Sequence, residues 1–254
     1  MNKKLIIIGV LLAGIVGSFG LYNQQSYADE TKSAQKLSQL AGEYVKNNPE
    51  LISKSVVSID SSNPSKKVIF DPEEIIATID SLKITKGEIE FRKGLRIASG
   101  TENADDKSVF NTLVEEKLII NYAIKNGVFP SEEKVNNFIQ SEKAIYEQDV
   151  ENKQMIDSFC SAANMTIDQY WDVYEYYNAF RIVTFKNAYD KAIELAVNNG
   201  DLPALGNDNQ ANSEIIKKYK EYWDNLKKEL KSITTIKVQQ QDYNLVVDKS
   251  KLYF

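Results

Sequence analysis

Apolar residues recur at helical spacing along most of the chain. The clearest stretch has one apolar face formed by Val109, Leu113, Ile120 and Ile124, with Phe110, Val114, Leu118 and Tyr122 alongside it. This spacing predicts an amphipathic helix. Its charged residues are expected on the solvent-exposed surface, at Glu115, Glu116, Lys117 and Lys125. Asn126-Gly127 is a typical helix C-terminus and predicts where this helix ends.

Capping residues predict where further helices begin. Four such starts are read at Asp71-Pro72-Glu73-Glu74, Thr85-Lys86-Gly87-Glu88, Ser131 and Thr166-Ile167-Asp168-Gln169. The helix that begins at Thr166 is long and stops at Asn199-Gly200. A charged amphipathic helix follows at Ser213–Leu230 after a loop rich in Gly, Pro, Asn and Asp. Residues 29–53 are expected to form a helical arm that is loosely attached.

Strand signals are few and lie near the two ends of the chain. The region 55–70 holds Ser55–Ile59 and Lys67–Phe70, and the region 233–247 holds Ile233–Val238 and Tyr243–Val247. Each pair flanks a polar turn and predicts a hairpin. Because a lone hairpin is only marginally stable in water, we expect the two pairs to meet in one small sheet. The predicted fold class is therefore predominantly α, with a small β element near the chain ends.

The N-terminus has the pattern of an export segment. Lys3 and Lys4 precede Leu5–Tyr22, which carries no charge. A positive region followed by an apolar one is typical of a signal peptide, and small residues at Ser26 and Ala28 suit cleavage after residue 28. The alternative is an uncleaved membrane anchor, because the apolar stretch is almost long enough to span a bilayer. Both alternatives place the body of the protein, residues 54–254 with the arm at 29–53, outside the cytoplasm of a bacterium.

Composition narrows the possible chemistry. The formal net charge is −5 and the isoelectric point about 5.1, so the chain lacks the basic excess that nucleic-acid binding requires. The absence of His excludes Ser-His-Asp and Cys-His nucleophiles and HExxH zinc sites. Cys160, the single cysteine, excludes an intramolecular disulfide and is expected to be buried. No catalytic residue, metal ligand or cofactor is predicted, and a membrane contact is expected only through residues 1–28 if they stay attached.

Carboxylates remain as possible catalytic groups. Most acids fall where solvated helix faces or caps would place them, at Glu115, Glu116, Glu132, Glu133 and Glu221. An enzyme that used carboxylates alone would need a deep pocket with two facing acids whose pKa values are raised.

An excess of aromatic residues marks the segment from Tyr170 to Tyr189. Its eight rings spread over more of a helix surface than a single core-facing stripe needs. One interpretation is a central helix that packs on several sides. The other is a groove for apolar peptide segments, since Tyr and Trp provide contact area at low entropic cost. In that case the candidate peptide-binding residues are Tyr170, Trp171, Tyr174, Tyr177, Phe180 and Arg181.

Several motifs resemble the N-terminal domain of SurA-type and PrsA-type extracytoplasmic chaperones. They are Ile84–Glu88 (ITKGE), Leu113–Ala123 (LVEEKLIINYA), Gly127–Val135 (GVFPSEEKV), Asn164–Trp171 (NMTIDQYW) and the helix-to-strand run from Tyr222 to Lys237. Together they cover about residues 75–238, and their order is that of the family. Asp80-Ser81 departs from the family's usual Asn-Gly turn. The parvulin isomerase domain, whose site relies on paired His residues, is missing.

The resemblance implies interlocked helices of the SurA N-terminal type and a binding function. It leads us to expect an exported chaperone-like protein that binds unfolded or extended polypeptides without prolyl isomerase catalysis. The alternative is an extracytoplasmic structural module that binds one folded partner or self-associates. The sequence leaves the oligomeric state open.

Overall fold

The structure of the chain is a computed structural model that describes residues 27–48, 74–98, 100, 103–206, 209–239 and 245–254. Helices dominate these residues, which confirms the predominantly α fold class. Nearly all of the predicted signal or anchor lies outside them, and so do the predicted strands Ser55–Ile59 and Lys67–Phe70. In the described ranges, no helix combines the length and the apolar character that a membrane span requires.

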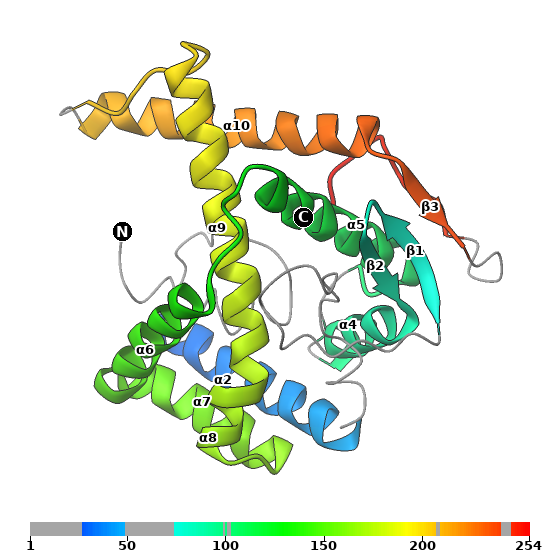
Figure 1. Cartoon of the computed structure of the whole chain (residues 1–254). Coiled ribbons are helices and arrows are strands. Elements are labelled where there is room, and N and C mark those ends of the chain that lie inside the picture. Colours follow the sequence, from blue (N-terminus) through cyan, green and yellow to red (C-terminus); the bar gives the residue numbers. More distant parts are fainter. Residues whose placement is uncertain (1–26, 49–73, 99, 101–102, 207–208, 240–244) are drawn as a thin grey trace.

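A long helix, α9 (Glu175–Asn198), runs through the molecule and joins two groups of elements (Figure 1). One group surrounds the first half of α9 and consists of α2 (Tyr27–Asn47), α6 (Glu132–Gln148), α7 (Val150–Ala163) and α8 (Ile167–Gln169). The other group includes α4 (Lys86–Ala98), α5 (Asp106–Lys125), α10 (Asn209–Ile233) and the sheet, and its helix α4 also packs against α2 of the first group. Because α5, α6 and α10 all contact α9, this helix is buried on several sides.

The three-stranded sheet has the order β2-β1-β3 and is antiparallel throughout. Its strands are β1 (Ile75–Ile79), β2 (Leu82–Thr85) and β3 (Ile236–Val238). A two-residue turn at Asp80-Ser81 joins β1 to β2, and Asp80 takes the left-handed conformation that such a turn needs (φ 50°). Pairing of β3 with β1 brings residues that are far apart in the sequence together, as expected for a small β element near the chain ends.

Two local predictions are wrong. The helix predicted to start at Asp71-Pro72-Glu73-Glu74 is replaced by β1 from Ile75 onward, because this β-branched run pairs on both sides and buries Ile76 and Ile79. The predicted hairpin between Ile233–Val238 and Tyr243–Val247 is also replaced. Its first strand shortens to β3 and pairs with β1, and the described residues 245–247 form no strand.

Helix α2 packs closely against α7, where the sequence predicts a loosely attached arm. Ala41 and Val45 are buried in this contact. At Gly42 the helices approach so closely that a Cβ atom would lie 2.5 Å from the carbonyl oxygen of Phe159. The described part of α2 is therefore part of the core.

Local capping interactions confirm most of the predicted helix ends. The Glu88 N–H donates to Thr85 Oγ1 (3.2 Å) and the Thr85 N–H donates to Glu88 Oε2 (2.9 Å), which completes one capping box. Ser131 caps α6, and Thr166 caps α8. Positive φ angles at Gly127 (67°) and Gly200 (82°) mark the turns that follow α5 and α9.

Candidate functional site

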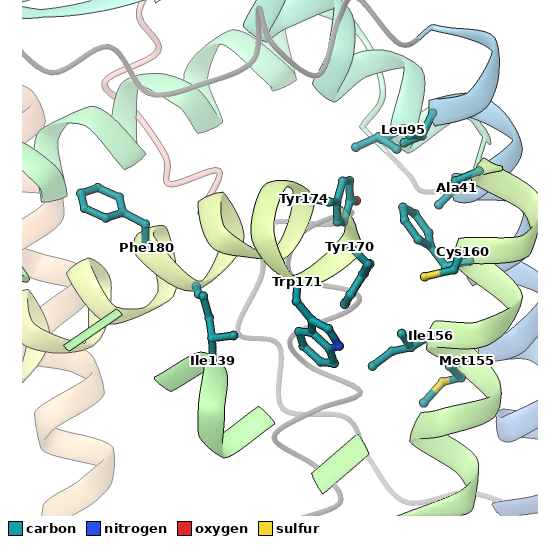
Figure 2. Close-up of a cluster of buried hydrophobic side chains, with 14 of the residues drawn as sticks. Ala41, Leu95, Ile139, Met155, Ile156, Cys160, Tyr170, Trp171, Tyr174 and Phe180 are labelled. Atoms are coloured by element: carbon teal, nitrogen blue, oxygen red, sulfur yellow. The ribbon is translucent and has the colours of Figure 1, made fainter. Parts of the chain in front are cut away.

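The first three rings of the predicted aromatic segment lie in the core. They belong to η1 (Tyr170–Tyr174), a π-helical turn in which the Glu175 N–H donates to the Tyr170 carbonyl. Figure 2 shows Tyr170, Trp171 and Tyr174 at the end of the helix nearest to the α7 residues Ile156 and Cys160. The ring centroids of Tyr170 and Trp171 are 4.9 Å apart, and those of Phe159 and Tyr174 are 4.6 Å apart. These separations are typical of packed aromatic cores.

The six predicted peptide-binding residues do not share one surface. Phe180 points away from the three η1 rings in Figure 2 and packs edge-on against Phe129 at 5.0 Å. Tyr177 is half-buried, and the other five side chains are buried: Tyr170, Trp171, Tyr174, Phe180 and Arg181. This packing agrees with the interpretation of a central helix. Binding of a peptide by these six residues stays a prediction.

Arg181 belongs to a buried ion network. Its guanidinium lies 3.1 Å from Glu116, which also receives a forked pair of hydrogen bonds from Arg92 at 3.1 and 3.2 Å. Glu116 is 3% exposed. Although burial opposes ionisation, the two guanidinium groups keep the pKa of Glu116 below its usual range. The carboxylate of Glu116 on α5 thus binds one arginine from α4 and one from α9.

Three consecutive charged residues of α5 are buried, where the sequence predicts that they face solvent. Glu115 is 1%, Glu116 3% and Lys117 1% exposed. Lys117 donates to Glu88 at 2.6 Å, while Glu115 accepts from Lys231 at 2.6 Å. The prediction fails because α5 has neighbours on all sides, so each charge meets a partner on a different element. Glu132, Glu133 and Glu221 are exposed as predicted.

A pair of buried carboxyl groups lies between α6 and α9. Glu142 and Glu175 are 6% and 1% exposed, and each carboxyl group influences the pKa of the other. The Tyr170 hydroxyl donates to Glu175 Oε2 at 2.9 Å. Burial and the neighbouring carboxyl raise the pKa of Glu142 well above its ordinary value, and burial also raises the pKa of Glu175. Among the described residues, nothing donates to Glu142 Oε2 or Glu175 Oε1.

The carboxyl pair has the raised pKa values that acid–base catalysis requires, but it does not line the groove between α2 and α7. That groove has a volume of about 740 Å³. Its walls are polar and include Gln39, Glu43, Gln154, Asp157 and Ser158, and neither Glu142 nor Glu175 lines it. In the described ranges, no three His, Cys, Asp or Glu side chains are grouped so that they could hold a metal ion.

A second group of rings, between α5, α9 and α10, is partly open to solvent. We call Tyr122, Phe185, Tyr189, Trp223 and Phe254 the α5/α9/α10 ring cluster. Trp223 packs edge-on against Tyr122 at 6.4 Å and Tyr189 at 5.7 Å, and Phe185 packs against Phe254 at 5.1 Å. Only Phe185 is buried, while the other four rings are of intermediate exposure. The cluster therefore offers accessible aromatic surface, in contrast to the rings of η1.

The last residues of the sequence, 245–254, run along α5 and end at this ring cluster. They adopt no helix or strand and are held by hydrogen bonds to their main chain. Glu115 accepts from the N–H groups of Tyr253 (2.8 Å) and Phe254 (2.7 Å). Burial raises the pKa of Glu115, although its partners Lys231, Tyr253 and Phe254 act in the opposite direction. A buried carboxyl group thus binds two successive peptide N–H groups.

The sequence pattern does not predict that Glu115 binds this segment, because it places Glu115 on a solvated helix face. It also assigns no function to Asn111, Trp223 or Lys231. One signal was present in the sequence: the charges at Glu115, Glu116 and Lys117 interrupt a helix that carries apolar residues on every side. Such a helix is buried all round, so charges within it need partners.

Comparison with known proteins gives no match: no family model, no curated protein and no solved structure is similar to this chain.

Proposed function

We propose that this protein is an extracytoplasmic chaperone-like protein that binds unfolded or extended polypeptide segments, without prolyl isomerase catalysis. The observation that carries the proposal is the α5/α9/α10 ring cluster, where four rings stay partly accessible and one of them, Phe254, comes from a segment that forms neither helix nor strand. Aromatic side chains that combine an apolar body with a polar tip suit contacts with polypeptides of varied sequence.

Two features of the sequence support the same function. The order of motifs between residues 75 and 238 resembles SurA-type and PrsA-type chaperones, and Lys3, Lys4 and the uncharged Leu5–Tyr22 support export. Binding would depend on burial of apolar surface, which contributes about 25 cal/mol per Å² and has little directional preference. Unfolded polypeptides lose conformational entropy when they bind, so we expect micromolar affinity and broad specificity.

The test is whether the purified protein suppresses aggregation of an unfolded model protein, measured by light scattering. Tyr189→Ala should weaken the suppression because it removes a partly accessible ring next to Trp223. The matched control is Tyr177→Ala, which removes another half-buried Tyr of α9. If both variants lost the same amount of suppression, the result would favour peptide binding by the predicted residues between 170 and 181. No suppression by the unchanged protein at several-fold molar excess would contradict the proposal, and a single stoichiometric folded partner would favour an interaction module.

A further inference from the structure

The segment 245–254 is bound mainly through its peptide groups. Asn111 on α5 donates to the Val246 carbonyl at 3.1 Å and accepts from the Asp248 N–H at 2.7 Å. One turn further along α5, Glu115 accepts from the N–H groups of Tyr253 and Phe254. The two side chains follow each other at i and i+4, so one face of α5 binds two separate stretches of main chain.

Helix α10 binds the carbonyl groups of the same segment. Lys231 donates to the Lys251 carbonyl at 3.2 Å, and Lys227 donates to the main-chain oxygen of Phe254 at 2.6 Å. These two lysines are also spaced at i and i+4. Helix α5 therefore supplies acceptors for N–H groups and one amide donor, while α10 supplies only donors. The irregular segment between them, which bends at residues 250–251, bonds to both helices.

The four side chains that bind the segment are themselves part of the core. Asn111 is 0%, Glu115 1%, Lys231 1% and Lys227 8% exposed. The segment they hold is much less buried, because Val246 and Lys249–Lys251 are exposed and Leu252, Tyr253 and Phe254 are only half-buried. With the segment in place, buried polar groups thus hold a peptide that lies near the surface.

Few side chains of the segment are recognised by the helices, so the site selects little for the sequence of its ligand. Phe254 enters the α5/α9/α10 ring cluster beside Phe185, and Leu245 packs in the core with α5. The hydrogen bonds from Asn111, Glu115, Lys227 and Lys231 to the segment all involve its main chain. They use carbonyl groups, which every residue offers, and N–H groups, which every residue except proline offers. Binding of this kind places few demands on sequence and suits many different polypeptides.

We infer that the surface between α5 and α10 is the binding site for unfolded polypeptide segments that carry an aromatic residue, and that residues 245–254 occupy it as an intramolecular competitor. This inference rests on the proposed function and names its site and its regulation. A bound polypeptide would replace the segment's main chain at Asn111 and Glu115 and place its ring beside Phe185. The free energy of releasing the segment lowers the apparent affinity for every other polypeptide.

The experiment compares two full-length variants that differ at one residue of the segment. Tyr253→Pro removes an N–H group that Glu115 binds, whereas Tyr253→Phe keeps this group and the ring. The probes are a fluorescent peptide with the sequence of residues 245–254 and reduced, carboxymethylated α-lactalbumin, which stays unfolded. We expect Tyr253→Pro to bind both probes about fivefold or more tightly than Tyr253→Phe and the unchanged protein. Asn111→Ala added to Tyr253→Pro should reverse this gain, because it removes a receptor contact.

Hydrogen exchange of the unchanged protein provides a second measurement that does not depend on the folding of a variant. The amides of Tyr253 and Phe254 should exchange faster when carboxymethylated α-lactalbumin is added, while the helical amide of Tyr170 should not change. Binding of the unfolded protein without faster exchange at Tyr253 and Phe254 would overturn this site, and so would a folded Tyr253→Pro variant that binds no more tightly. If neither the unchanged protein nor any variant binds the unfolded protein, the proposed function itself fails.

Discussion

The carboxyl groups of Glu142 on α6 and Glu175 on α9 are both buried, and they lie close enough for each to influence the pKa of the other. Two buried carboxylates so close to each other cannot both be ionised at low cost, so the pair retains a proton at neutral pH. Tyr170, Asn178 and Arg181 are the other polar groups that interact with Glu175. This arrangement predicts how the stability of the protein depends on pH.

Stability should fall as the pH rises from about 5 to about 7. Both carboxyls have an ordinary pKa of 4.5, and the folded protein raises it, to about 7 for Glu175 and higher for Glu142. Below pH 4.5 both glutamates are protonated in the folded and in the unfolded state, so their raised pKa values do not lower the free energy of unfolding. Above it the unfolded state ionises first, which favours unfolding by about 1.4 kcal/mol per pH unit and group. Urea unfolding at pH 5, 6 and 7 measures this slope.

Glu142→Gln should reduce that slope, since glutamine supplies a neutral group of the same shape. We expect the variant to be more stable than the unchanged protein by about 1 kcal/mol or more at pH 7, with a smaller difference at pH 5. Glu147→Gln, at an exposed position of the same helix, is the control and should leave the slope unchanged. An equal loss of stability at both pH values in Glu142→Gln would contradict the shared proton.

Glu116→Gln should destabilise the protein strongly. The substitution leaves the buried guanidinium groups of Arg92 and Arg181 without their carboxylate, and the loss of one partner in a buried pair costs about 3–5 kcal/mol. Lys125→Met breaks the exposed pair with Asp80, at 2.7 Å, and should cost about 1 kcal/mol or less. Urea denaturation of both variants measures the two losses, and equal losses would contradict the role of burial.

Gly42→Ala should weaken the contact between α2 and α7. The new Cβ atom would lie 2.5 Å from the Phe159 carbonyl oxygen and 2.9 Å from the Cβ atom of Ala162, so the helices would have to separate. Overpacking of this kind costs about 1–3 kcal/mol. Gly206→Ala is the control because nothing lies within 4 Å of its added Cβ atom. Thermal unfolding followed by circular dichroism should show a lower midpoint for Gly42→Ala only.

Cys160 should react slowly with thiol reagents in the folded protein. Burial raises the pKa of its thiol from 9.0 to about 11, which lowers the thiolate fraction about a hundredfold at pH 8. The rate with a disulfide reagent at pH 8 should rise by at least that factor in 8 M urea. Comparable rates with and without urea would show that the thiol is accessible.

The sequence predicted the helices well because their signals are local. Thr85, Ser131 and Thr166 bind backbone N–H groups three residues away, and Gly127 and Gly200 take backbone angles that other residues avoid. Each of these interactions lies within one helical turn, so neighbouring residues determine it. The start predicted at Asp71 failed because β1 depends on pairing with β2 and β3, and β3 lies far away in the sequence.

The candidate site was less predictable, because it depends on which helix faces meet. Periodicity placed Glu115 on the surface, yet α10 and the last residues of the chain cover that face of α5. The sequence does not distinguish the aromatic rings of η1, which are buried, from Trp223, which is partly exposed. The η1 rings are buried because α7 packs against them in the tertiary structure.

By itself, the sequence determined the helical class, the helix ends and the exclusion of His-dependent chemistry, because these follow from residue types and contacts between near neighbours. The tertiary structure alone decided that Glu115 binds the main chain of Tyr253 and Phe254 and that Glu142 meets Glu175. Those pairs are separated by dozens of residues, and a charged side chain becomes buried only when folding brings its partner to it.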